Sequence, residues 1–124
     1  MKILVLDDCA TIRAILKVFL MNPETELLEA KDGSTALRIL RDQPVDLVVA
    51  DVQMEGMDGI EFVAAVRSDP SATLQAIPVI LLTSDLDEEL KMRGLAAGAN
   101  AFVHKPISPA ALKQAIGVAV GRAG

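Results

Sequence analysis

The chain has 124 residues, with 17 acidic and 12 basic side chains, a formal net charge of −5 at pH 7, and 52% hydrophobic residues. A chain of this length can bury a sizeable core, and we expect a single domain over residues 1–124 with no output domain. The basic residues are scattered singly along the sequence, so direct binding to nucleic acid is not expected.

The start of the chain and its cysteine content indicate the compartment. The apolar run that begins at Ile3 stops at Asp7, and no small-residue cleavage site follows, so no export signal is expected. The apolar runs are too short to cross a bilayer, so membrane insertion is not expected. Cys9 is the single cysteine, which excludes an internal disulfide and is typical of a reducing compartment. We therefore expect a cytoplasmic protein.

Short apolar runs alternate with stretches of helical spacing along the whole sequence. Runs such as 47–50 are apolar on both sides, as in a parallel sheet that helices cover on both faces. Strands that alternate with helices imply right-handed crossovers, so the sequence predicts an α/β protein with a parallel sheet. The predicted strands are residues 4–6, 27–30, 46–50, 77–82 and 100–103.

Five helices are predicted between and after these strands. The second helix follows the turn at Asp32-Gly33 and ends near residue 42, and the third begins at Gly59 and ends at Asp69-Pro70. The fourth covers about 86–97, with Gly98 as its left-handed cap. Ser108-Pro109 marks the start of the last helix.

The first and last helices each show one apolar stripe expected to face the sheet. Arg13 and Lys17 lie one turn apart outside the first stripe, where we expect a solvated face. The stripes are Ile12, Ile15, Leu16, Phe19 and Leu20 in the first helix, and Leu112, Ala115, Ile116, Ala119 and Val120 in the last.

Polar side chains collect where the predicted strands end, at the edge where open parallel sheets bind ligands. Three carboxylates at this edge would repel each other, and their hard oxygens suit Mg²⁺. A lysine and a hydroxyl beside them are the groups expected around a phosphoryl group, and a carboxylate can itself attack phosphorus. The residues are Asp7 and Asp8 after the first strand, Asp51 after the third, Thr83 and Ser84 after the fourth, and Lys105 after the fifth.

These motifs, taken in order, resemble the receiver domain of two-component response regulators. The likeness covers the whole chain and rests on the Asp7-Asp8 pair, the segment D-V-Q-M-E-G-M-D-G that starts at Asp51, Thr83, and the segment A-G-A-N-A-F-V-H-K-P. No single motif decides it, but several in register are specific. The segment L-D-D-C-A-T-I-R-A-I-L is similar to the start of stand-alone chemotaxis-type receivers.

The resemblance implies a fold and a set of roles. The fold would be a flavodoxin-like, three-layer (βα)5 arrangement with strand order 2-1-3-4-5. Asp51 would be the phosphoacceptor, with Lys105 as the cation that binds the phosphoryl group. Thr83 would be the switch hydroxyl and Phe102 the switch aromatic. Mg²⁺ would be held by Asp8, Asp51 and the backbone carbonyl of Gln53, and by Asp7 mainly through water.

The resemblance also implies partners. The phosphodonor would be a histidine kinase or a histidine phosphotransfer protein, which in receivers docks on the first helix. The output would pass to a protein effector through a face made by the helix 86–97, the strand 100–103 and the last helix. Such a domain is a signalling module that assists its own phosphorylation and dephosphorylation rather than an enzyme. We expect a monomer or a weak dimer.

Two positions depart from the family pattern. Glu55 stands where the family usually has proline, four residues after the phosphoacceptor, and Ile107 follows Lys105-Pro106 where Phe or Tyr is frequent. We expect Glu55 to change the rate of the reaction or the mobility of its loop. Gln53 and Asp85 would flank the path of hydrolytic water and tune the lifetime of the phosphorylated state.

Three alternatives remain open at this point. The domain can be a relay carrier that passes its phosphoryl group to another histidine protein. It can be a metal-dependent phosphohydrolase with an aspartyl nucleophile, although those enzymes need an acid two residues beyond the nucleophile, where Asp51 is followed by Gln53 and Asp7 by Cys9. It can also be an interaction module that keeps only the fold.

Overall fold

Alternation of apolar strands with helices gives a three-layer fold in the computed structural model, which describes residues 1–84 and 87–121. The strands are β1 (Lys2–Leu6), β2 (Glu26–Ala30), β3 (Leu47–Asp51), β4 (Val79–Thr83) and β5 (Ala101–His104). The helices are α1 (Ala10–Leu20), α2 (Gly33–Asp42), α3 (Gly59–Arg67), α4 (Ala72–Gln75), α5 (Glu88–Ala97) and α6 (Pro109–Ala119).

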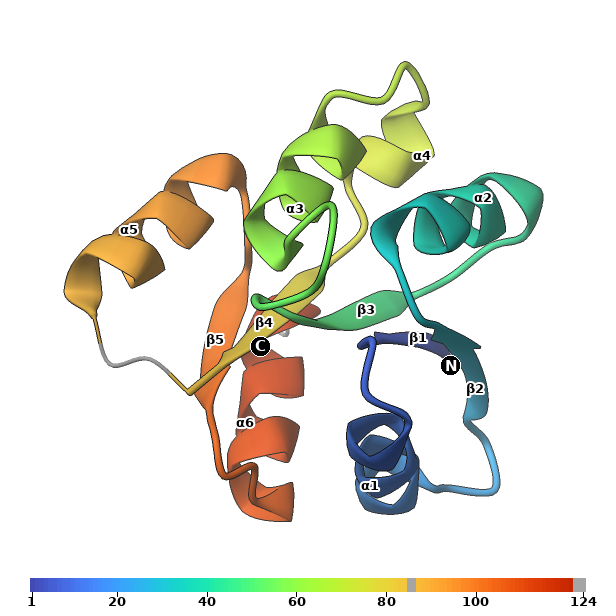
Figure 1. Ribbon diagram of the computed structural model, residues 1–124. Coiled ribbons are helices and arrows are strands. Elements are labelled where there is room, and N and C mark those ends of the chain that lie inside the picture. The colour runs from blue at the N-terminus through green and yellow to red at the C-terminus, as the bar shows by residue number, and fades with distance from the viewer. Residues whose placement is uncertain (85–86, 122–124) are drawn as a thin grey trace.

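The sheet is parallel and has the strand order β2-β1-β3-β4-β5, so the predicted flavodoxin-like topology is confirmed. Helices α1 and α6 cover one face, and α2, α3 and α5 cover the other (Figure 1). Successive strand residues face opposite layers. Val48 packs in the core under α2 and α3, whereas Leu47 and Val49 pack in the core under α1 and α6.

The helix boundaries agree with the capping signals in the sequence. Gly98 ends α5 with φ of 115°, and the Ser108 hydroxyl accepts a hydrogen bond from the Ala111 N–H at 3.1 Å at the start of α6. The Asp32 carboxylate likewise accepts from the Thr35 N–H at 2.7 Å. The predicted start of α5 near residue 86 lies outside the described residues.

The prediction of five helices was wrong by one short element. Helix α4 forms a single turn whose first N–H groups are capped by the Ser71 hydroxyl, which accepts from the Leu74 N–H at 3.3 Å. A helix of four residues is too short to show a repeating apolar pattern, so sequence periodicity could not reveal it.

Two residues assigned to buried stripes are exposed instead. Ile15 is 38% exposed, because Leu16 and Leu20 define the face of α1 that meets the sheet and Ile15 is turned by about 100° from Leu16. Val120 is 40% exposed, because α6 ends at Ala119 and the following residue no longer continues the inward face. Both stripes are therefore narrower than the spacing of apolar residues suggested.

The strand register brings the predicted site residues to one edge of the sheet. Leu6 of β1 pairs with Ala50 of β3, so Asp7 and Asp51 follow at the same level on neighbouring central strands. Asp51 pairs with Leu82 of β4, one residue before Thr83. The crossover from β1 to α1 and that from β3 to α3 leave the sheet here in different directions, which opens the edge between them.

Gly59 allows α3 to begin directly against the end of β3. Its N–H donates to the Val52 carbonyl at 2.8 Å, and a Cβ at this position would overlap the Asp51 carbonyl oxygen and lie 2.8 Å from Val52 Cα. Backbone atoms cannot move aside as a flexible side chain can. The absence of a side chain at residue 59 is therefore needed to hold the loop that carries the site.

We predict that Gly59→Ala lowers the free energy of unfolding by about 1–3 kcal/mol, through overpacking against backbone. Gly117→Ala is the matched control, since a Cβ there meets nothing within 4 Å and alanine favours a helix. Urea unfolding of the three proteins provides the measurement. An equal or higher stability of Gly59→Ala relative to the unchanged protein would contradict this account.

Candidate functional site

The carboxylate of Asp51 lies at the centre of the polar edge. The residue is 5% exposed, and its Oδ2 is 2.6 Å from Lys105 Nζ, while Oδ1 accepts from the Gln53 N–H at 3.1 Å. The Lys105 N–H donates to the Thr83 carbonyl at 2.8 Å, so the end of β4 fixes the backbone that carries the lysine. This pairing offsets the cost of burying the Asp51 charge.

Asp7 is fully buried beside Asp51. Its Oδ1 accepts from the Cys9 N–H at 2.8 Å, and its Oδ2 is the one buried side-chain polar atom within residues 1–84 and 87–121 that lacks a hydrogen-bond partner. Burial first, and then the negative charge of Asp51, raise the pKa of Asp7 to about 6, against the opposing effects of the Cys9 N–H and Lys105. Two carboxylates are both acceptors and cannot satisfy each other unless they share a proton, whereas a cation can bind that oxygen directly.

Two basic residues on α1 surround Glu29, and one of them also holds the backbone of Asp7. Arg13 Nη1 donates to the Asp7 carbonyl at 2.6 Å, and Arg13 Nε donates to Glu29 Oε1 at 2.9 Å. Lys17 Nζ lies 2.6 Å from Glu29 Oε2, and the two basic residues lower the pKa of Glu29. The prediction that Arg13 and Lys17 form a solvated face was incomplete, because both side chains pair with Glu29 on β2.

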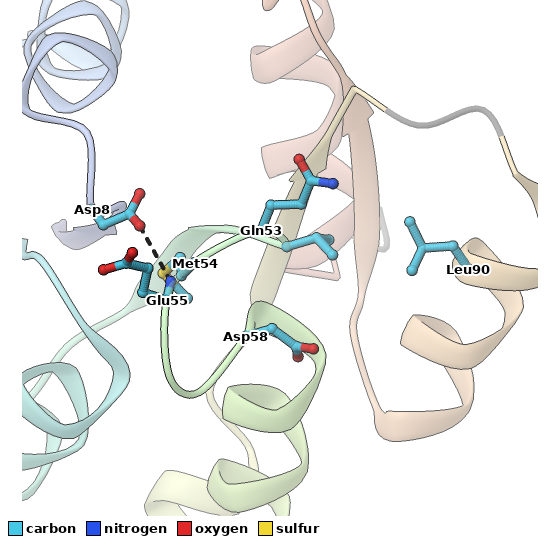
Figure 2. Close-up of a pocket in the computed structure, with 7 residues that line it drawn as sticks. Asp8, Gln53, Met54, Glu55, Asp58 and Leu90 are labelled. Carbon is cyan, nitrogen blue, oxygen red and sulfur yellow. Dashed lines mark hydrogen bonds between the residues drawn. The ribbon is translucent and has the colours of Figure 1, made fainter.

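Asp8 is exposed, and its carboxylate is turned toward the loop after β3. Its Oδ2 accepts from the backbone N–H of Glu55 at 3.3 Å (Figure 2). Both residues border an open pocket of about 520 Å³. The lining residues are Asp8, Val52, Gln53, Met54, Glu55, Asp58 and Leu90.

The predicted metal ligands are gathered at this edge but are held by protein donors. Within the described part of the chain, no three His, Cys, Asp or Glu side chains form a group that could hold a metal ion as they stand. The donor chemistry nevertheless fits a hard cation, because Asp7 Oδ2 is buried without a donor beside a second carboxylate. A cation there would satisfy that oxygen.

The two predicted switch residues lie on adjacent strands. Thr83 is 6% exposed at the end of β4, and Phe102 is half-buried on β5. The Phe102 ring packs against α5, where it occupies the space beside Gly94: a Cβ on that residue would overlap Phe102 Cζ and lie 2.9 Å from Cε1. His104 is exposed. Asp85, assigned above to the path of hydrolytic water, lies outside the described residues.

Comparison with known proteins agrees with this geometry. The model of the response regulator receiver domain family matches residues 3–117. Chemotaxis protein CheY of Pseudomonas aeruginosa is 38% identical over 117 residues, which cover 94% of this chain and 93% of that protein.

Solved structures show the same arrangement of elements. That of chemotaxis protein CheY4 of Vibrio cholerae has a TM-score of 0.87 at 32% identity and covers 95% of this chain and 97% of its own. The receiver domain of a sensor histidine kinase of Pseudomonas aeruginosa PAO1, solved with a magnesium ion in its active-site cleft, shares the fold with a TM-score of 0.84 at 22% identity over 97% of both chains. None of the described helices here is long and apolar enough to span a bilayer.

The raised pKa of Asp7 predicts a pH-dependent cost to stability in the absence of divalent cations. The carboxyl group of Asp7 has a pKa of 3.8 in the unfolded chain and about 6 in the folded chain, so the cost is largest above pH 6 and disappears as the pH falls from 6 to 3.8. Asp7→Asn should therefore raise the free energy of unfolding at pH 8 by about 1–3 kcal/mol, since 1 pKa unit is about 1.4 kcal/mol.

Urea unfolding in a chelating buffer at pH 8 and pH 4 tests this prediction. Most of the gain from Asp7→Asn should disappear at pH 4, where the folded aspartic acid is itself neutral. The exposed Asp42→Asn serves as the control and should change little at either pH. The prediction is wrong if the gain is absent at pH 8 or is equally large at pH 4.

Proposed function

Since the chain belongs to the response regulator receiver domain family and is a CheY-like domain of two-component signalling, we propose that it is a phosphorylation switch with Asp51 as its phosphoacceptor. The observation that carries this proposal is the buried Asp51 carboxylate, held 2.6 Å from Lys105 Nζ with Asp7 beside it. A nucleophilic carboxylate needs such positive charge to approach a phosphoryl group.

The proposed reaction is a direct transfer. An Asp51 carboxylate oxygen attacks the phosphorus of a phosphohistidine, the new O–P bond forms, and the P–N bond breaks with its electron pair going to the imidazole nitrogen, which takes a proton from solvent. Asp51 is then an acyl phosphate without a carboxylate charge, so the Lys105 ammonium would pair with the phosphoryl oxygens instead. The later loss of the phosphoryl group to water would restore the carboxylate.

The resident cation fits Mg²⁺, with Asp7, Asp8, Asp51 and the backbone carbonyl of Gln53 as the residues that would hold it. When bound, such an ion supplies positive charge that offsets repulsion between the carboxylates and the incoming phosphoryl oxygens. The unpartnered Asp7 Oδ2 supports this assignment, and so does the raised pKa of Asp7, which burial and the negative charge of Asp51 produce.

Thr83 and Phe102 would convert the new charge into a change of surface. Thr83 lies at the end of the strand between Asp51 and Phe102, so its hydroxyl is placed to move toward a phosphoryl oxygen. The ring of Phe102 would then redistribute between a position against α5 and an outward one. A coupling of this kind is typically about 1–3 kcal/mol, so both positions would be populated before phosphorylation.

The partners follow from the family. We propose a cytoplasmic protein that receives its phosphoryl group from a histidine kinase or a histidine phosphotransfer protein docked near α1, and that acts on a protein effector through the face formed by α5, β5 and α6. Helix α1 exposes Ile15, Val18 and, just past its end, Met21, which gives a donor an apolar contact surface.

We predict that Asp51→Asn abolishes Mg²⁺-dependent binding of beryllofluoride, a mimic of the phosphoryl group, because the amide supplies no anionic oxygen to beryllium. Binding can be followed by fluorine NMR. Asp58→Asn is the matched control, since Asp58 caps α3 through Oδ1 and asparagine keeps an acceptor oxygen there. Undiminished binding by Asp51→Asn would remove Asp51 as the phosphoacceptor.

We also predict that Gly94→Ala shifts the Phe102 ring outward in the unphosphorylated protein, because the added methyl group takes the space of the ring against α5. Aromatic side-chain NMR of Phe102 measures the shift. Gly117→Ala tests the general effect of alanine in a helix, since open space surrounds that position. If Phe102 keeps the same environment in both variants, the ring position does not depend on Gly94.

A further inference from the structure

The loop between β3 and α3 is tied firmly at both ends. The Val52 N–H donates to the Leu82 carbonyl at 2.9 Å, and the Gly59 N–H donates to the Val52 carbonyl at 2.8 Å. Asp58 and Glu61 form a capping box that fixes the start of α3. Any movement of residues 53–57 is therefore limited by the fixed backbone at Val52 and at the start of α3.

The middle of this loop is joined to Asp8, two residues after β1, by a long hydrogen bond. The Glu55 N–H donates to Asp8 Oδ2 at 3.3 Å, beyond the usual 2.9–3.0 Å of a strong N–H···O bond, and both side chains are exposed. A charged acceptor strengthens such a bond, whereas its length and exposure make it easy to exchange. It is suited to holding a carboxylate that must also be released.

The donor is a backbone N–H, so its effect can be separated from the charge of the Glu55 side chain. Every residue except proline supplies an N–H at this position. The negative side chain acts differently, because it adds to the negative charge around the pocket that Asp8, Glu55 and Asp58 line. Substitutions at residue 55 can remove the charge alone or the charge together with the donor.

We propose that Glu55 is a positioning residue for Asp8: its backbone N–H holds the Asp8 carboxylate toward the loop, so that the loop and a divalent cation compete for that carboxylate. The inference rests on the proposed metal-dependent function and extends it to the control of metal binding. Cation binding then releases the Glu55 N–H, and a loop held against Asp8 weakens cation binding.

The test compares Mg²⁺ affinity of Glu55→Pro, which lacks both the charge and the N–H, with that of Glu55→Gln, which lacks only the charge. Isothermal titration calorimetry gives each dissociation constant. Loss of one such hydrogen bond should make Mg²⁺ binding about three- to tenfold tighter in the proline variant than in the glutamine variant. Thermal unfolding checks that both variants are folded.

Proline also stiffens the loop, and an Asp8→Ala background, which has no side-chain acceptor for the Glu55 N–H, separates that effect. If the donor acts through Asp8, the difference in affinity between proline and glutamine at residue 55 disappears when Asp8 is replaced. A difference that persists in that background would overturn the proposal, since it would arise from loop stiffness alone.

The unchanged protein supplies an independent measurement. Saturation with Mg²⁺ should raise the solvent-exchange rate of the Glu55 amide, measured by NMR, while the Val52 and Gly59 amides, bonded to backbone carbonyls, keep theirs. Equal affinities of the two variants, or an unchanged Glu55 amide, would overturn this inference and leave Asp51 as phosphoacceptor intact. A protein that binds no Mg²⁺ at all would overturn both proposals.

Discussion

The burial of Asp51 against Lys105 is the interaction on which the site depends. An isolated carboxylate at 5% exposure would be costly, and Asp7 adds a second one beside it. Lys105 Nζ, at 2.6 Å from Asp51, compensates for one of these negative charges. Burial of the second carboxylate, together with the negative charge of Asp51, raises the pKa of Asp7 to about 6. This edge of the sheet therefore has an excess of buried negative charge, which a cation or a proton can neutralise.

Sequence reasoning could predict the edge because it depends on strand order and on strand ends. Parallel strands deliver the residues after them to the same side, so Asp7, Asp51 and Thr83 meet whatever the fine details of packing. The apolar runs of the strands and the caps at Gly98 and Ser108 are local signals, readable without knowledge of neighbours. The resemblance to receivers added the roles of these residues and the strand order, which periodicity alone does not give.

The details that sequence could not supply are contacts between elements. Arg13 on α1 donates to the Asp7 carbonyl and to Glu29, a partner 16 residues away on β2. The bond from the Glu55 N–H to Asp8 joins residues 47 positions apart and involves a backbone atom, which leaves no mark in residue type. Ile15 fits a helical stripe as well as its neighbours do, and only the orientation of α1 on the sheet decides that it is exposed. Tertiary geometry fixes all three.

The contacts of Lys105 and the pairing of β4 with β5 connect Asp51 with Phe102, and the proposed switch would use this connection. Lys105 follows β5, its N–H donates to the carbonyl of Thr83, and β5 pairs with residues 80–83 of β4. Phe102 lies on the same β5, three residues before Lys105, and its ring rests on α5 beside Gly94. In the proposed switch, a displacement of Lys105 or Thr83 would act on the strand that carries the ring, through the hydrogen bonds of the sheet. On the other side of the site, Asp8 is joined to the loop between β3 and α3 by a long hydrogen bond. This contact is weaker than the pairing of β4 with β5, so we expect the two sides of the site to respond differently to a change in charge.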